Sequence, residues 1–293
     1  MERRTIFGHR PLPIALVAPQ FLLTLIFFLW PACEAVWSSL IRQDPFGLHS
    51  QFAGFDNFVA LLVDPLYRNS VGRTALFMIA VSSLSLSLAL FLAVFADREI
   101  RGRVTYRTLL IWPYAIAPAM AAVLWLLLLQ PRIGILGVWL NEHGIAWDYH
   151  LNDAQAMLMI VLACAWKQVS YNFIFFLAGL QSVPRAVLEA ARMDGARGWH
   201  RFRTITFPLL APTTFFLLVV NLVYAAFDTF GTIQALTQGG PGQATETLVV
   251  KVYRDGFMNQ DIGSSSAQSV VLMLGVVGLT ALQFRFLGRR RTT

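Results

Sequence analysis

Six long apolar stretches decide what this chain can fold into. Five of them are at least 23 residues long and contain no Asp, Glu, Lys or Arg: residues 11–33, 74–96, 108–131, 204–227 and 262–284. The sixth, residues 154–184, contains one charge, Lys167. At about 1.5 Å per residue, a helix of this length crosses a hydrocarbon layer of roughly 30 Å. Because a bilayer offers the backbone no hydrogen-bond partners, each stretch must be helical. The sequence therefore predicts an all-α, polytopic membrane protein with six transmembrane helices.

The overall composition excludes several other classes of protein. Hydrophobic residues make up 56% of the 293 residues and charged residues only 13%. A soluble domain carries about twice that charged share, and a disordered chain is far more polar. Two cysteines are too few for a disulfide framework or a multi-cysteine zinc site.

The basic residues predict the orientation of the helices. Of the 23 lysines and arginines, 16 fall before the first span, after the second, after the fourth or in the C-terminal tail. Six fall in the segments on the opposite side, and Lys167 lies within a span. Since basic residues accumulate on the cytoplasmic side, both termini are expected to be cytoplasmic. The net charge of +7 then reflects topology, and no nucleic-acid partner is expected.

Catalytic and nucleotide-binding motifs are missing from the sequence. It contains no H-E-x-x-H, no G-x-S-x-G and no phosphate-binding G-x-x-x-x-G-K-[ST]. We therefore expect no catalytic residue, metal site or cofactor in this chain. Two rival classes remain: a membrane-embedded enzyme, which would turn over a lipid or peptide alone, and a passive channel, which would work without ATP.

The segment between the fourth and fifth spans predicts a helix–turn–helix on the cytoplasmic face. Residues 187–193 favour helix, and Gly195 can end it by entering the left-handed region. A short amphipathic piece with Trp199 and Phe202 follows, and Pro208 suits the start of the next helix. The alternative interpretation is a solvated basic loop without a partner.

This segment also resembles a known family. It follows the pattern E-A-A-x₃-G-x₉-I-x-L-P at Glu189, Ala190, Ala191, Gly195, Ile205 and Pro208, with Phe207 in place of the leucine. The pattern is the EAA motif of permease subunits of type I ATP-binding-cassette importers. The resemblance implies that this chain couples to an ATPase through Glu189, Ala190, Ala191, Asp194 and Gly195. It also implies that ATP and Mg²⁺ are bound by the partner ATPase and not by this chain.

The resemblance extends to the carbohydrate-uptake branch of these permeases. The stretch 236–241, with Thr245 after it, is similar to that branch, and residues 11–284 most resemble the first permease subunit of glycerol-3-phosphate importers. The implied substrate is sn-glycerol 3-phosphate or a glycerophosphodiester; the alternative is a neutral sugar or oligosaccharide. The implied setting is multi-pass in the bacterial inner membrane. The implied partners are a second homologous permease, an ATPase dimer and a periplasmic substrate-binding protein.

The same resemblance suggests how the chain is divided. Residues 1–70 would form an anchor helix and the first periplasmic loop. Residues 71–285 would form the five-helix core with the coupling loop 185–208, and residues 286–293 a basic cytoplasmic tail.

Polar residues in the fourth and fifth spans are candidates for the substrate pathway. They are Lys167, Gln168, Tyr171, Asn172, Asn221, Tyr224 and Asp228. Lys167 is the sharpest case, because a charge in mid-span costs at least about 2.5 kcal/mol on insertion scales. One cation with amides and phenols suits a phosphate ester that carries hydroxyls. The alternative is that these groups bond across helix–helix interfaces, and that Asp228 marks the end of its span.

Overall fold

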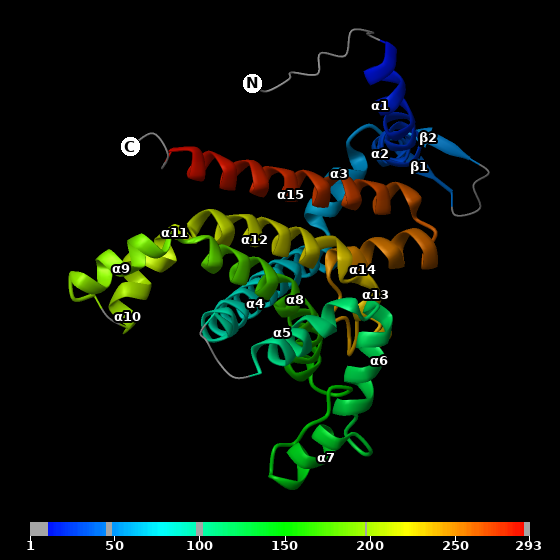
Figure 1. The fold of residues 1–293 in the computed structure, drawn as a ribbon. Helices are drawn as coiled ribbons and strands as arrows, with labels where there is room; N and C mark the ends of the chain where they lie inside the picture. The colour runs from blue at the N-terminus through cyan, green and yellow to red at the C-terminus, as the bar shows by residue number, and fades with distance from the viewer. Residues whose placement is uncertain (1–10, 45–48, 98–101, 197, 290–293) are drawn as a thin grey trace. The chain divides into compact units, whose positions relative to one another are not determined.

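The computed structural model describes residues 11–44, 49–97, 102–196 and 198–289 (Figure 1). Within them the chain is helical apart from loops and one antiparallel hairpin, in which β1 (Ile41–Gln43) pairs with β2 (Ser50–Phe52). The expected all-α class is confirmed. Backbone contacts divide the chain into two compact units, described in turn: Met1–Asp64 with Val252–Met273, and Pro65–Lys251 with Leu274–Thr293.

The first unit begins with one long apolar helix. It is formed by α1 (Pro11–Thr24), the π-helical turn η1 (Leu25–Leu29) and α2 (Trp30–Ser39). The π turn ends two residues before Pro31, whose ring nitrogen has no hydrogen to donate to the preceding turn. None of the apolar segment of this helix is buried within the structure, as expected for a helix that faces lipid.

A buried asparagine holds the end of this helix. The Asn57 side chain, at the start of α3 (Asp56–Val63), donates hydrogen bonds to the carbonyls of Ser39 at 2.9 Å and Ile41 at 3.0 Å. Ser39 is the last residue of α2, where carbonyls have no partner within the helix. Gly263 in α15 (Ile262–Arg289) lies so close to the Ile41 carbonyl that a Cβ atom would collide with it. The first turn of α15 therefore packs on the same junction.

The second unit is built on two long helices that run in the same direction, α4 (Pro65–Ala96) and α8 (Asp153–Ser182). The Asn152 side chain accepts hydrogen bonds from two backbone amides of the first turn, which fixes the start of α8. Small residues of α4, such as Ala89 and Ala93, let Phe173 and Phe176 of α8 pack closely against it. α12 (Ala211–Val223) adds Leu217 to this cluster.

The third expected span is broken in the middle. The sequence predicts one helix over 108–131, with kinks at Pro113 and Pro118. The structure instead has α5 (Arg103–Ile111), a 3₁₀ turn η2 (Trp112–Ala115) and α6 (Pro118–Leu129), with a bend of 105°. Ala117, before Pro118, is extended at φ −58° and ψ 143°, as the following proline ring requires. The break is therefore local to two prolines and is larger than a kink.

Within the described residues, five helices are long and apolar enough to span a membrane, and the bent pair makes six if it counts as one span. The predicted six-helix architecture is confirmed in this sense. The second span is longer than expected, because α4 begins at Pro65 and includes Arg68 and Arg73. Shorter helices lie between the spans: α7 (Ile135–Glu142), α13 (Phe230–Leu236) and α14 (Leu248–Tyr253). π-helical turns η4 (Tyr224–Asp228) and η5 (Arg254–Met258) follow α12 and α14.

Candidate functional site

The coupling loop folds as a short helix closed by a glycine. α9 (Arg185–Met193) is followed by Gly195 at φ 82°, and the Ala196 amide donates to the Ala191 carbonyl at 2.9 Å. This six-to-one bond with a left-handed residue inside it is a Schellman motif. A Cβ at Gly195 would meet no atom within 4 Å, so backbone conformation and not space selects glycine.

The outer face of α9 is exposed, and the inner face is packed. Glu189, Ala190, Asp194 and Gly195 are exposed, whereas Ala191 is buried. Met193 is 89% exposed, which is unusual for a large apolar side chain. Four of the five predicted coupling residues are therefore exposed, and the fifth, Ala191, packs against the rest of the structure.

The second half of the loop returns the chain to the membrane. It consists of α10 (Gly198–Arg201), the π turn η3 (Phe202–Thr206) and α11 (Phe207–Leu209). The rings of Trp199 and Phe202 stack with centroids 5.3 Å apart. Pro208 occupies the first turn of α11, where its missing N–H is tolerated. The predicted helix–turn–helix is present.

Two of the predicted pathway residues are bonded to each other. The amides of Asn172 in α8 and Asn221 in α12 exchange hydrogen bonds of 3.0 and 2.7 Å, and both side chains are fully buried. The Ser85 hydroxyl of α4 donates to the same Asn221 oxygen at 2.8 Å, and Asn221 also donates to the Leu217 carbonyl. In this conformation the two amides join three helices.

A second cluster of polar side chains lies around Lys167. Lys167 is half-buried and interacts electrostatically with Asp228, which is exposed at the end of η4. The Tyr224 hydroxyl, half-buried on the same turn, is hydrogen-bonded to the thiol of Cys164. The predicted stripe of α12 and η4 is thus divided: Asn221 meets Asn172, whereas Tyr224 and Asp228 meet the Lys167 region.

The other two predicted residues of α8 differ in accessibility. Gln168 is buried, and Tyr171 is half-buried. The Tyr171 ring lies 5.6 Å from that of Tyr114 in η2 and 4.8 Å from that of Phe175. The broken third span therefore brings an aromatic ring to the polar stripe of α8.

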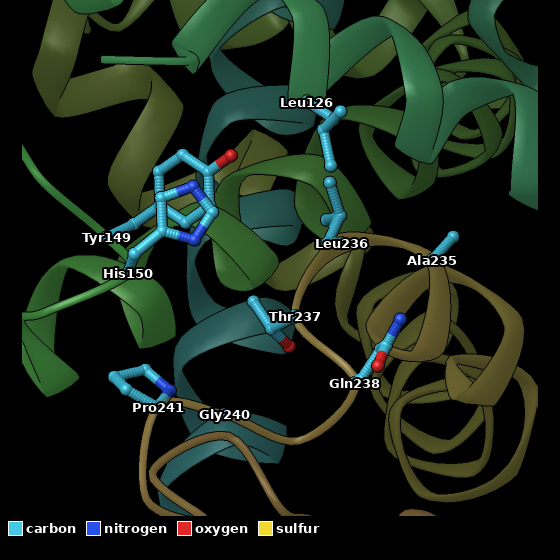
Figure 2. Close-up of a pocket in the computed structure, with 9 residues that line it drawn as sticks. All are labelled: Leu126, Tyr149, His150, Ala235, Leu236, Thr237, Gln238, Gly240 and Pro241. Carbon is cyan, nitrogen blue, oxygen red and sulfur yellow. The ribbon is translucent and has the colours of Figure 1, made fainter.

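A cavity of about 380 Å³ lies beside the segment 236–241 (Figure 2). Figure 2 shows the rings of Tyr149 and His150 next to each other. Their centroids are 4.1 Å apart. Gln238 has φ 52°, a strained conformation for a residue other than glycine. Burial, and then the charge of Asp148, raises the pKa of Tyr149 above its ordinary value, so its phenol is neutral at physiological pH.

The described residues contain no group of three or more His, Cys, Asp or Glu side chains that could hold a metal ion. The polar groups gathered in the spans can bind and orient a solute. The coupling loop can bind a partner protein.

Comparison with known proteins identifies the family. Residues 12–292 match the model described as binding-protein-dependent transport system inner membrane component. The chain belongs to this family. It is accordingly an inner-membrane permease component, and the resemblance inferred from the EAA motif is confirmed.

The most informative relatives are named permeases. The chain is 57% identical over 288 residues to the sn-glycerol-3-phosphate transport system permease protein UgpA of Rhizobium meliloti (strain 1021), covering 98% of each chain. It is 58% identical to the protein of the same name from Agrobacterium fabrum over 97% of each chain. For that of Yersinia enterocolitica the identity is 53% over 95% of each.

Solved structures show the same fold. A bacterial ABC transporter involved in the import of the acidic polysaccharide alginate has a chain that matches with a TM-score of 0.81, covering 96% of both chains. A second structure of the alginate transporter, in complex with an alginate pentasaccharide-bound periplasmic protein, matches with a TM-score of 0.82. The identity in both cases is 22%, so the likeness concerns the permease fold alone.

Several buried polar residues of this family member were not singled out from the sequence. Gln268 of α15 is fully buried and donates to Asp255 at 2.6 Å within the first unit. Ser85, which bonds Asn221, was one of several serines in its span. A search for every amide within the charge-free stretches would have found Gln268, whereas Ser85 has no distinguishing signal in the sequence.

Proposed function

We propose that this permease carries sn-glycerol 3-phosphate, or a glycerophosphodiester, across the inner membrane as part of an ATP-driven, binding-protein-dependent importer. The observation that carries the proposal is 57% identity, over 98% of both chains, to a permease named for sn-glycerol 3-phosphate transport. Identity of this level over the full length includes the spans that would contact a solute.

The polar groups of the second unit support a phosphate-ester substrate. Lys167 supplies one cation in α8. Of the most apolar segment of this helix, 67% is buried within the structure, against 39% for that of α4. The phenols of Tyr171 and Tyr224 are half-buried on the same side of the bundle as Lys167, one on α8 and one facing it from η4. A phosphate group needs a cation, and glycerol hydroxyls need groups that donate and accept. Asn172 and Asn221 support this role by fixing the helices that carry these residues.

The coupling loop supports the transfer of work from an ATPase. Glu189 would pair with a basic group of that subunit, while Gly195 sets the turn that presents α9. Closure of an ATPase dimer around ATP would favour the outward-open state, because α9 makes different contacts in the two states. ATP and Mg²⁺ would be bound by the ATPase, and this chain would contribute no catalytic group.

The remaining parts of the assembly follow from the same role. A second homologous permease would complete the pathway, and a periplasmic binding protein would deliver substrate to the outward loops. Both termini would be cytoplasmic. The core would comprise residues 71–285, after an anchor region 1–70 and before the tail 286–293; the boundary at residue 70 lies inside α4.

Reconstitution tests the proposal. The complex of both permeases and the ATPase, in proteoliposomes with ATP inside, should take up radiolabelled sn-glycerol 3-phosphate when the binding protein is added. Unlabelled substrate should compete, and glycerol or a neutral disaccharide should not. Uptake of the disaccharide instead would contradict the substrate, and uptake without ATP would contradict the importer mechanism.

A further inference from the structure

A cavity of about 570 Å³ lies between the coupling loop and the ends of two spans. Leu90 and Val94 of α4, Leu180 of α8 and Leu188 of α9 form its apolar walls. Its volume is in the range of about 300–1,000 Å³ that is usual for ligand sites. All its lining residues belong to the second unit.

Two opposite charges share this apolar cavity. Arg201 of α10 lines it, and so does Asp97 at the end of α4. Arg201 is half-buried and Asp97 is exposed. Within the described parts of the chain, no hydrogen bond or ion pair satisfies either side chain. A ligand that carries both an anion and a cation next to an apolar tail would complement the cavity.

The position of the cavity indicates the source of such a ligand. Its walls are the last apolar turns of two spans, and Trp199 at its edge is 72% exposed. Trp199 belongs to α10, between the coupling helix and the fifth span, and exposed tryptophan is typical of the membrane–water interface. The cavity therefore lies at the level where phospholipid headgroups meet acyl chains.

We propose that this cavity binds one phosphatidylethanolamine molecule, with its phosphate at Arg201, its ammonium at Asp97 and an acyl chain along the walls formed by α4 and α8. Phosphatidylglycerol brings no cation to Asp97, and the quaternary ammonium of phosphatidylcholine has no N–H to donate. The assignment to the inner leaflet rests on the proposed cytoplasmic position of the coupling loop.

The bound lipid would brace the coupling helix. Leu188 in the cavity wall precedes Glu189 on the exposed face of α9, so a filled cavity supports the helix from its inner side. A phospholipid would thus couple the bilayer to the element that contacts the ATPase.

Lipid retention tests the site directly. The purified, delipidated complex is given equal amounts of phosphatidylethanolamine, phosphatidylglycerol and phosphatidylcholine, and retained lipid is counted by native mass spectrometry. We expect phosphatidylethanolamine to be retained above the other two. Arg201→Gln should lower its retention about fivefold, the effect of one basic contact near a membrane surface. Asp97→Asn should abolish the preference over phosphatidylglycerol.

A matched control is Arg203→Gln, which removes the same charge two residues away at an exposed position that does not line the cavity. It should retain phosphatidylethanolamine as the wild type does. Equal retention of all three lipids, preference for phosphatidylglycerol, or an equal loss in both arginine variants would overturn the proposal. So would wild-type retention no higher than that of Arg201→Gln, which would mean that a partner chain fills the cavity.

Retention and uptake distinguish this site from the proposed function. Selective retention without uptake of sn-glycerol 3-phosphate would leave the lipid site standing and refute the substrate. Uptake without selective retention would refute the lipid site and leave the proposed substrate standing.

Discussion

Asn172 and Asn221 face each other across the α8–α12 interface and exchange hydrogen bonds of 3.0 and 2.7 Å. Both are fully buried, and Ser85 ties α4 to the same pair. Polar side chains inside a bilayer are costly unless they find partners, so this mutual pairing explains why two amides are tolerated in the spans. In this conformation the pair serves helix packing, and a solute would have to compete with these bonds to reach it.

A double-mutant cycle should detect this pairing as a coupling energy. Asn172→Leu and Asn221→Leu each leave one buried amide without its partner, whereas the double variant removes both. The double variant should therefore be less destabilised than the sum, with a coupling of about 0.6–1.7 kcal/mol, as in other membrane helices. Unfolding by SDS titration measures it. Additive losses of stability would contradict a direct pair, and loss of uptake at unchanged stability would indicate substrate contact instead.

Gly195→Val should abolish uptake while the chain still inserts into the membrane. The left-handed φ of 82° costs a residue other than glycine roughly 1–2 kcal/mol, and a β-branched side chain is the least suited to it. Gly195→Asn is the matched control, because asparagine is found at this position of helix ends. It should keep most of the uptake. Radiolabelled uptake at equal membrane expression compares the two, and wild-type rates from the valine variant would contradict the assignment.

Contact of α9 with the ATPase can be measured separately. Ala190→Cys places a thiol on the exposed face of α9, and Ala191→Cys places one on its buried face. In native membranes a bifunctional cross-linker should capture a nucleotide-hydrolysing neighbour from position 190 and far less from 191. Failure of Ala190→Cys to capture such a neighbour would refute the coupling role.

Tyr149 should make a small contribution to stability that disappears in alkali. Its pKa is raised above 10, first by burial and then by the charge of Asp148, so folding favours the neutral phenol. The stabilisation is therefore complete below pH 10 and is lost as the pH rises through the raised pKa. Tyr149→Phe should remove this part of the alkaline decline in the free energy of unfolding. Asp148→Asn should move the pKa, followed by phenolate absorbance, back toward its ordinary value; an unchanged titration would contradict the second cause.

The sequence predicted those features that depend on single segments. The spans follow from runs without charge, and the turn at Gly195 follows from the conformation that only glycine adopts readily. The prolines at 113 and 118 predicted a disturbance of the third span, but not a bend of 105°, because the angle depends on what packs around α6.

Pairings between distant segments were not predictable. Asn221, Tyr224 and Asp228 share a stripe by helical periodicity, yet periodicity gives the direction of a stripe and not what lies opposite it. The structure places Asn172 against Asn221, 49 residues apart, and Asp228 near Lys167. Nothing in a single sequence favours one such pairing over another.

Lys167 should distinguish a phosphate-ester substrate from a neutral sugar. Lys167→Met keeps the length of the side chain and removes the cation. Loss of a hydrogen bond to a charged group costs about 1.5–3 kcal/mol, so uptake of sn-glycerol 3-phosphate at low concentration should fall roughly tenfold to a hundredfold. Lys167→Arg keeps the charge and should restore part of the uptake. Tyr171→Phe removes one proposed neutral contact from the same stripe of α8, and it should cost less than the loss of the cation. Uptake is measured in proteoliposomes at equal protein density, with ATP hydrolysis followed in parallel to show that the complex is assembled.

Unchanged uptake of the phosphate ester by the methionine variant would exclude Lys167 as the phosphate ligand. It would leave the electrostatic interaction with Asp228 as the reason why α8 carries a charge in mid-membrane.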